Sequence, residues 1–138
     1  MRLKPAFRFA LYGAFAFLFV TGAAWLAADR LKESSELWQE IAADLLMLHG
    51  GAAMATLMIL GALFPLHVQR GWRAQKNRVA GAVMVICNAL LIVTAFGLYY
   101  AGSDTLRPWI SDAHTGIGLV LPALFAVHIA LGRRSVRY

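Results

Sequence analysis

The sequence predicts an all-α integral membrane protein, a bundle of four transmembrane helices with both termini on the cytoplasmic side. Three observations lead to this fold class. Hydrophobic residues make up 60% of the 138 positions, and charged residues make up only 14%. Four stretches, at 9–28, 45–69, 79–103 and 113–132, contain no Asp, Glu, Lys or Arg. The 13 Lys and Arg residues are divided very unevenly among the segments between these stretches.

Each charge-free stretch is 20 to 25 residues long, and a helix of about 20 residues spans the hydrocarbon core of a bilayer. Transmembrane strands would instead appear as short segments that alternate apolar with polar residues. We therefore expect membrane helices at about 7–28, 43–69, 78–102 and 110–132. The polar connections are too short to hold a second fold, so residues 1–138 are expected to form a single domain.

Basic residues precede the first expected helix, which is also typical of a secretory signal peptide. The apolar run of this helix is longer than the usual core of a signal peptide, however, and therefore favours a membrane span. Segment 29–44 carries apolar residues at helical spacing. It is either a short amphipathic helix or an outward continuation of the second membrane helix.

The basic residues predict the topology. Ten of them lie in the N-terminal segment, in the loop at 70–78 and in the C-terminal segment, whereas the other two loops hold three, together with all seven acidic residues. Positive residues near helix ends are retained on the cytoplasmic side, so both termini are expected there. The net charge of +6 is therefore explained by topology. The expected surrounding partner is therefore membrane lipid, and the basic residues are not expected to bind nucleic acid.

All four histidines lie inside apolar stretches, where an ionisable side chain is costly and marks a candidate functional site. At about 100° per residue, the 18-residue step from His49 to His67 returns to the same helix face. The 14-residue step from His114 to His128 stops about 40° short of it. The number of residues between each histidine and the nearest charged residue indicates its depth in the membrane. These depths predict an outer pair, His49 with His114, and an inner pair on the cytoplasmic side, His67 with His128.

Two imidazoles on facing helices of a bundle are a ligand set that haem takes at its axial positions. The two histidine pairs therefore predict two stacked haems. Small residues near the outer histidines leave room for a flat macrocycle to pack: Gly50, Gly51 and Gly118. Cations near the membrane surfaces are candidates to bind the haem propionates: Arg70, Arg107 and Arg133.

This arrangement resembles the small bacterial di-haem membrane cytochromes b, in which the second and fourth helices of a four-helix bundle each carry two haem-ligating histidines. The resemblance covers nearly the whole chain. It implies that the four histidines are axial ligands of haem b, bound without covalent attachment, in a multi-pass protein of the bacterial inner membrane. The 14-residue separation matches the family, whereas the 18-residue separation departs from it by a full turn. Pro65 can kink the second helix and help to reconcile the levels.

The resemblance also implies a role. Electrons would pass across the membrane between a redox partner and the quinone pool, and the chain would act as an electron-transfer subunit of a quinone-linked oxidoreductase. A soluble or membrane redox protein would dock on one face, within a homo- or hetero-oligomer. Direct oxidation or reduction of a small molecule at the outer haem is a second version, in which the protein would be an enzyme by itself.

Two alternatives stay open. One is a single haem held by His49 and His114, where the glycines are densest. The other is a cofactor-free membrane anchor subunit of a redox complex. The single cysteine, Cys87, excludes a covalent Cys-x-x-Cys-His haem and a four-cysteine iron–sulfur cluster. The lack of carboxylates in the apolar stretches argues against a zinc or di-iron site and against a small transporter.

Overall fold

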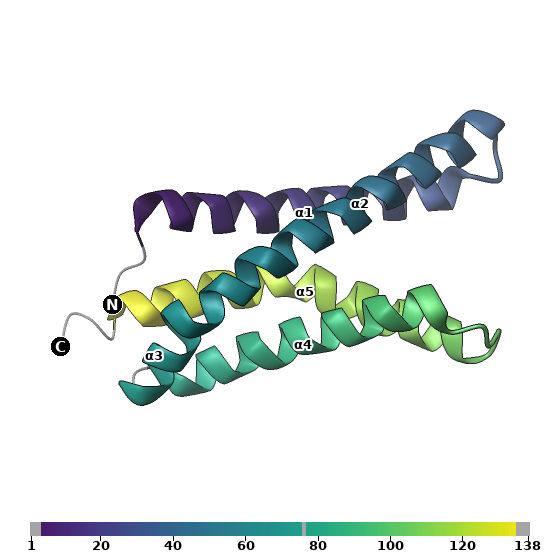
Figure 1. The fold of residues 1–138 in the computed structure, drawn as a ribbon. Coiled ribbons are helices and arrows are strands. Elements are labelled where there is room, and N and C mark those ends of the chain that lie inside the picture. The colour runs from purple at the N-terminus through teal and green to yellow at the C-terminus, as the bar shows by residue number, and fades with distance from the viewer. Residues whose placement is uncertain (1–3, 76, 135–138) are drawn as a thin grey trace. The chain divides into compact units, whose positions relative to one another are not determined.

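The computed structural model describes residues 4–75 and 77–134, and this part of the chain is all-helical (Figure 1). The elements follow in the order α1 (Pro5–Leu31), α2 (Glu36–Leu63), a π-helical segment η1 (Phe64–Val68), α3 (Gln69–Arg73), α4 (Arg78–Tyr100) and α5 (Leu106–Arg134). Within these residues, four helices are long and apolar enough to cross a membrane: α1, the continuous helix Glu36–Arg73, α4 and α5. The expected all-α class and the four candidate spans are therefore confirmed.

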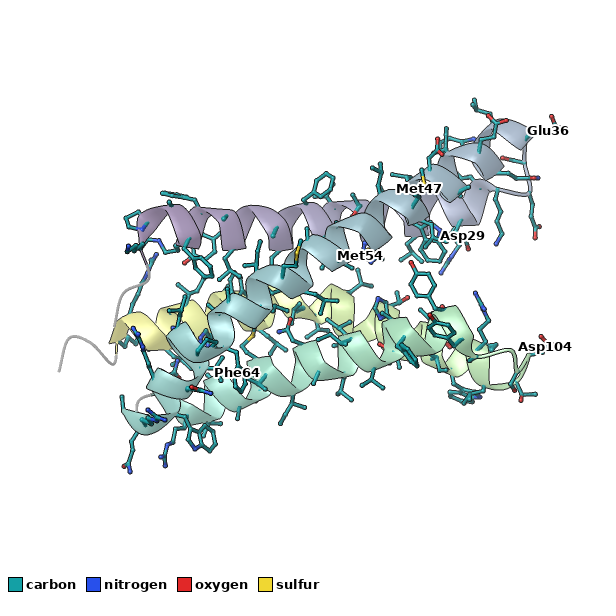
Figure 2. All side chains as sticks on the ribbon, in the orientation of Figure 1. Asp29, Glu36, Met47, Met54, Phe64 and Asp104 are labelled. Atoms are coloured by element: carbon teal, nitrogen blue, oxygen red, sulfur yellow. The ribbon has the colours of Figure 1, made fainter. Side chains whose placement is uncertain are left out.

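The chain forms two compact units, Met1–Arg70 and Gly71–Tyr138. In the first unit α1 packs against α2, and in the second α4 packs against α5. Each unit is a helical hairpin, whose chain reverses at 32–35 in the first and at 101–105 in the second. Figure 2 shows Asp29 and Glu36 beside the connection of the first hairpin, and Asp104 in that of the second. Acidic residues thus lie at the end where each hairpin turns.

Helix α2 begins at Glu36, well before the apolar stretch, because Ser35 caps its N-terminus. Ser35 has an extended backbone, and its hydroxyl accepts a hydrogen bond of 3.4 Å from the N–H of Trp38. The carboxylate of Glu36 in the first turn interacts favourably with the positive end of the helix dipole. Of the two alternatives for this segment, the structure shows the outward continuation of the second helix, which starts earlier than the expected residue 43.

The connection at 32–35 is held mainly by Ser34. Its hydroxyl and its N–H both donate to the carbonyl of Leu31, at 2.6 and 2.9 Å. Lys32 also pairs with Asp29 at 2.8 Å. The hydrogen bond to Asp29 and the charge of that carboxylate raise the pKa of Lys32 above its ordinary value. Because this ion pair is exposed to solvent, it contributes little to stability.

Pro65 is accommodated by a π turn, η1. Proline has no N–H, and its ring collides with the carbonyl four residues earlier, so regular α-helical bonding cannot continue through it. The N–H of Gln69 bonds to the carbonyl of Phe64, five residues back, which is the π-helical pattern. The kink expected at Pro65 therefore takes the form of a wide turn, and His67 lies within it.

The second hairpin has close contacts at both ends. A Cβ added to Gly97 would lie 3.1 Å from Cδ1 of Ile110, so glycine allows α4 and α5 to approach closely beside their connection. At the other end Asn77 precedes α4 with a φ of 52°, a conformation that asparagine tolerates better than most residues. Its Nδ2 donates to the carbonyl of His128 at 3.3 Å. These contacts set the register of α4 against α5.

Large apolar side chains are exposed on every long helix. Phe17 of α1, Met58 of α2, Val93 of α4 and Val127 of α5 are each exposed by 53% or more. Soluble monomeric proteins rarely carry extensive apolar patches of this kind, whereas lipid tails would cover them. The exposed surfaces therefore agree with helices that cross a membrane.

The N-cap of α2 offers a test of the fold. We expect Ser35→Ala to lower the free energy of unfolding by about 0.5 kcal/mol, at the low end for an N-cap because the 3.4 Å bond is long. Unfolding in detergent micelles, followed by circular dichroism, measures the change. Ser35→Asp restores an acceptor and should restore stability. Equal destabilisation by alanine and aspartate would contradict the capping role.

Candidate functional site

The four histidines are divided equally between the two hairpins. His49 lies on α2 and His67 on η1, whereas His114 and His128 lie on α5. All four side chains are half-buried. Each predicted pair combines a histidine of one hairpin with a histidine of the other, so the pairing stays a prediction. Within each hairpin, the contacts show how the individual rings are held.

His49 is anchored to α1 through its Nδ1 atom. Nδ1 lies 3.0 Å from the carbonyl oxygen of Leu18 and 3.2 Å from Oγ1 of Thr21. A carbonyl oxygen can only accept a hydrogen bond, so Nδ1 must carry the proton. In the neutral ring the lone pair then lies on Nε2. This is the tautomer that a histidine needs in order to bind a metal through Nε2.

Gly22 allows the His49 ring to approach the backbone of α1. A Cβ added at Gly22 would lie 2.8 Å from Cε1 and 3.1 Å from Nδ1 of His49. Separations under 3.0 Å are not found for real Cβ atoms, so any larger residue would displace the ring. Thr21, beside it, is 95% buried and directs its own hydroxyl to the carbonyls of Phe17 and Leu18. Glycine and threonine together form the seat of the His49 ring.

His114 is anchored to α4 through a threonine, as His49 is to α1. Its Nδ1 lies 2.8 Å from Oγ1 of Thr94. The Thr94 hydroxyl lies 2.7 Å from the carbonyl of Leu90 and donates its single proton there. Oγ1 of Thr94 therefore accepts from Nδ1 of His114, and the lone pair of this ring also lies on Nε2.

The two hairpins thus contain the same feature, which we call the threonine–histidine module: Thr21 with His49, and Thr94 with His114. In each module the threonine is on the first helix of the hairpin and the histidine is on the second. Both modules lie in the half of the hairpin nearest its connection, because Thr21 precedes the end of α1 by 10 residues and Thr94 precedes the end of α4 by six. These are the two histidines of the predicted outer pair.

The other two histidines are held differently. His67 lies in the π turn, where each residue adds less rotation and less rise than in an α-helix. The 18-residue step from His49 therefore stops short of the same helix face that regular α-helical geometry predicts, and the two histidines lie closer along the helix axis than in a regular α-helix. The His128 ring lies beside the backbone of Ala80 on α4. The backbone carbonyl of His128 accepts a hydrogen bond from Nδ2 of Asn77.

The glycines predicted to pack against haem are not required by contacts within their own hairpins. A Cβ at Gly51 would meet no atom within 4 Å, and Gly51 is exposed in a shallow apolar groove of about 330 Å³ between α1 and α2. A Cβ at Gly118 would touch only Leu91, at an ordinary 3.9 Å. Gly50 is half-buried beside His49. The three cations predicted to bind propionates are exposed near helix ends: Arg70, Arg107 and Arg133.

The residues that seat the histidines were not identified from the sequence. Gly22 could not be connected to His49 by its position on one helix alone. A signal was nevertheless present. In an antiparallel hairpin, residues at similar distances from the connection are neighbours. Thr94 precedes the end of α4 by six residues, and His114 follows the start of α5 by eight. Counting outward from the connection would have placed Thr94 near the level of His114.

Among residues 4–75 and 77–134, no three or more His, Cys, Asp or Glu side chains gather into a group that could hold a metal ion. Haem iron needs only one or two protein ligands, because the macrocycle supplies the others. Comparisons of the chain with models of protein families, with curated proteins and with solved structures find no match. Its class is therefore defined by its own residues: an all-helical protein with four candidate spans and a threonine–histidine module in each hairpin.

The tautomers of the two module histidines can be measured directly. In metal-free protein at a pH well above the ordinary histidine pKa, we expect ¹⁵N NMR of labelled histidine to show His49 and His114 with the proton on Nδ1. Signals are assigned with the His49→Asn and His114→Asn variants. A proton on Nε2 and none on Nδ1 of either ring would overturn the assignment of Nδ1 as its donor atom.

Proposed function

We propose that the protein is a membrane b-type cytochrome that relays electrons across the membrane through bis-histidine haem b. The observation that carries the proposal is the pair of threonine–histidine modules. Each places an imidazole in an apolar helix with Nδ1 donating to the neighbouring helix, which puts the lone pair of the ring on Nε2, the atom that would bind iron. Metal-ligating histidines have this arrangement, because the second hydrogen bond fixes the tautomer and orients the ring.

The donor set fits haem better than it fits a bare metal ion. The charge-free stretches at 45–69 and 113–132 contain the four histidines and no carboxylate, whereas zinc and di-iron sites require more protein ligands. When bound, haem iron supplies a one-electron couple. In the proposal His49 and His114 hold the outer haem, and His67 and His128 hold the inner one. Arg107 would then bind the propionates of the outer haem, and Arg70 and Arg133 would bind those of the inner haem.

The proposed topology is a four-helix bundle in the bacterial inner membrane with both termini in the cytoplasm. The charge distribution supports it, because ten of the 13 basic residues lie in the segments assigned to the cytoplasm. The acidic connecting ends of both hairpins would then lie outside (Figure 2).

The proposed partners are the quinone pool and a redox protein that docks on one face. Haem in the outer position would exchange electrons with one of them and haem in the inner position with the other. In this role the chain is an electron-transfer subunit, and the chemical reaction takes place on its partner.

Haem content tests the proposal. We expect the purified protein, expressed with ample haem, to contain two haem b per chain by pyridine haemochrome assay. His49→Ala and His114→Ala should each remove one haem, because a single axial imidazole binds much more weakly than two. Asn88→Ala is the matched control. Asn88 is a polar residue of a candidate span, and its Nδ2 donates to the carbonyl of Met84 on its own helix at 2.8 Å.

The outcomes separate the alternatives. One haem per chain, lost on substitution of His49 or His114, would support the single-haem cytochrome. Absence of haem from protein shown to be folded would overturn the proposal and favour the cofactor-free membrane anchor subunit.

Topology is tested by cysteine labelling in intact cells. In a Cys87→Ala background, we expect Ser103→Cys, in the connection of the second hairpin, to react with a membrane-impermeant maleimide. Ala74→Cys, between the two hairpins, should react only after the cells are opened. The reverse pattern would invert the proposed orientation.

A further inference from the structure

We propose that Thr21, with Gly22, and Thr94 are positioning residues that strengthen His49 and His114 as ligands and thereby lower the reduction potential of the outer haem. This inference rests on the proposed function. It assigns to three residues of α1 and α4 a role in the electron-transfer chemistry that their own side chains do not perform directly.

The first support is the direction of the hydrogen bonds. Thr94 already bonds to its own helix through the 2.7 Å contact with the Leu90 carbonyl, and Thr21 does so through the 2.9 Å contact with Phe17. Neither hydroxyl needs the histidine in order to place its proton. The contact therefore benefits the imidazole: Thr94 gives Nδ1–H of His114 an acceptor in an apolar environment, and Thr21 gives Nδ1–H of His49 a second acceptor beside the carbonyl of Leu18.

The second support is repetition. The same contact occurs in two hairpins whose partners are 28 residues apart in one case and 20 in the other. Packing of two apolar helices does not require a threonine at either place. The repetition follows naturally if both axial ligands of one haem need the same support.

The third support is the seat at Gly22. A Cβ there would come within 2.8 Å of Cε1 of His49, and this atom belongs to the far end of a side chain. Alanine at this position would therefore move the ring and leave the helix in place. Gly13, on the same helix, has no atom within 4 Å of an added Cβ and offers a matched control.

The chemical consequence concerns ligand strength. Donation from Nδ1–H to an oxygen shifts electron density towards Nε2 and makes the ring a more basic ligand. A more basic ligand stabilises ferric more than ferrous iron, so the reduction potential falls. Removal of the acceptor should reverse this effect, because second-sphere hydrogen bonding is one of the means by which a protein sets haem potentials.

The test is a spectroelectrochemical titration of the purified, haem-loaded full chain. In Thr94→Val we expect haem to be retained and one component of the titration to shift to a more positive potential, while the other stays unchanged as an internal reference. Thr94→Ser keeps the hydroxyl and should return the wild-type potential. Thr21→Val should shift the same component in the same direction but by less, because the carbonyl of Leu18 still accepts from Nδ1 of His49 at 3.0 Å.

The glycine pair adds an independent comparison. Gly22→Ala should shift the same component or release that haem, whereas Gly13→Ala should match the wild type in both haem content and potential. A matching effect of the two alanines would show that the seat of His49 has no special role.

The failure of this inference is distinct from that of the proposed function. Wild-type protein without haem would overturn the proposed function. Haem-loaded Thr94→Val and Thr21→Val with wild-type potentials would overturn only the tuning role. Loss of haem in Thr94→Val that serine does not restore would assign Thr94 to packing, and would also overturn it.

Discussion

The hydrogen bond from an imidazole N–H to an acceptor on the neighbouring helix is the interaction on which the rest of the structure depends. A polar group inside an apolar helix pair is costly unless it is paired, so the position of each histidine constrains the helix beside it. For His49 this requires the carbonyl of Leu18 and the hydroxyl of Thr21 to lie at the same level. The register of the first hairpin therefore follows from one ring and its acceptors.

Threonine suits this role for a physical reason. On a helix its hydroxyl reaches back to the carbonyl four residues earlier, as Thr94 does to Leu90, which places its proton and leaves oxygen lone pairs for an incoming donor. Thr56 makes the same backward bond, to Ala52, and is 97% buried. The hydroxyl thus remains satisfied in an apolar setting with or without a histidine, and the module can be placed in the middle of a membrane-compatible helix.

The helix that carries His49 and His67 shows how a local constraint alters a larger geometry. Pro65 cannot continue α-helical bonding, and the π turn around it adds a residue without the full rise. The change acts in the direction that brings the 18-residue interval nearer to the 14-residue interval of α5. π turns also occur frequently at functional sites, which agrees with a histidine in this one.

What the sequence determined by itself was the set of helices. Apolar length, the uneven positions of charges and the location of His49 and His114 inside apolar runs are properties of single segments, and four helices of the expected type were found. The outer start of α2 at Glu36 was one of two alternatives, decided by the cap at Ser35.

Only the tertiary structure decided how the histidines are seated. Thr21, Gly22 and Thr94 acquire their roles from the level at which two helices meet. The wide turn at His67 likewise depends on how the chain around Pro65 relieves a clash. Periodicity describes one helix about its own axis, whereas a contact between helices depends on their relative register, and the composition of each helix alone does not specify it.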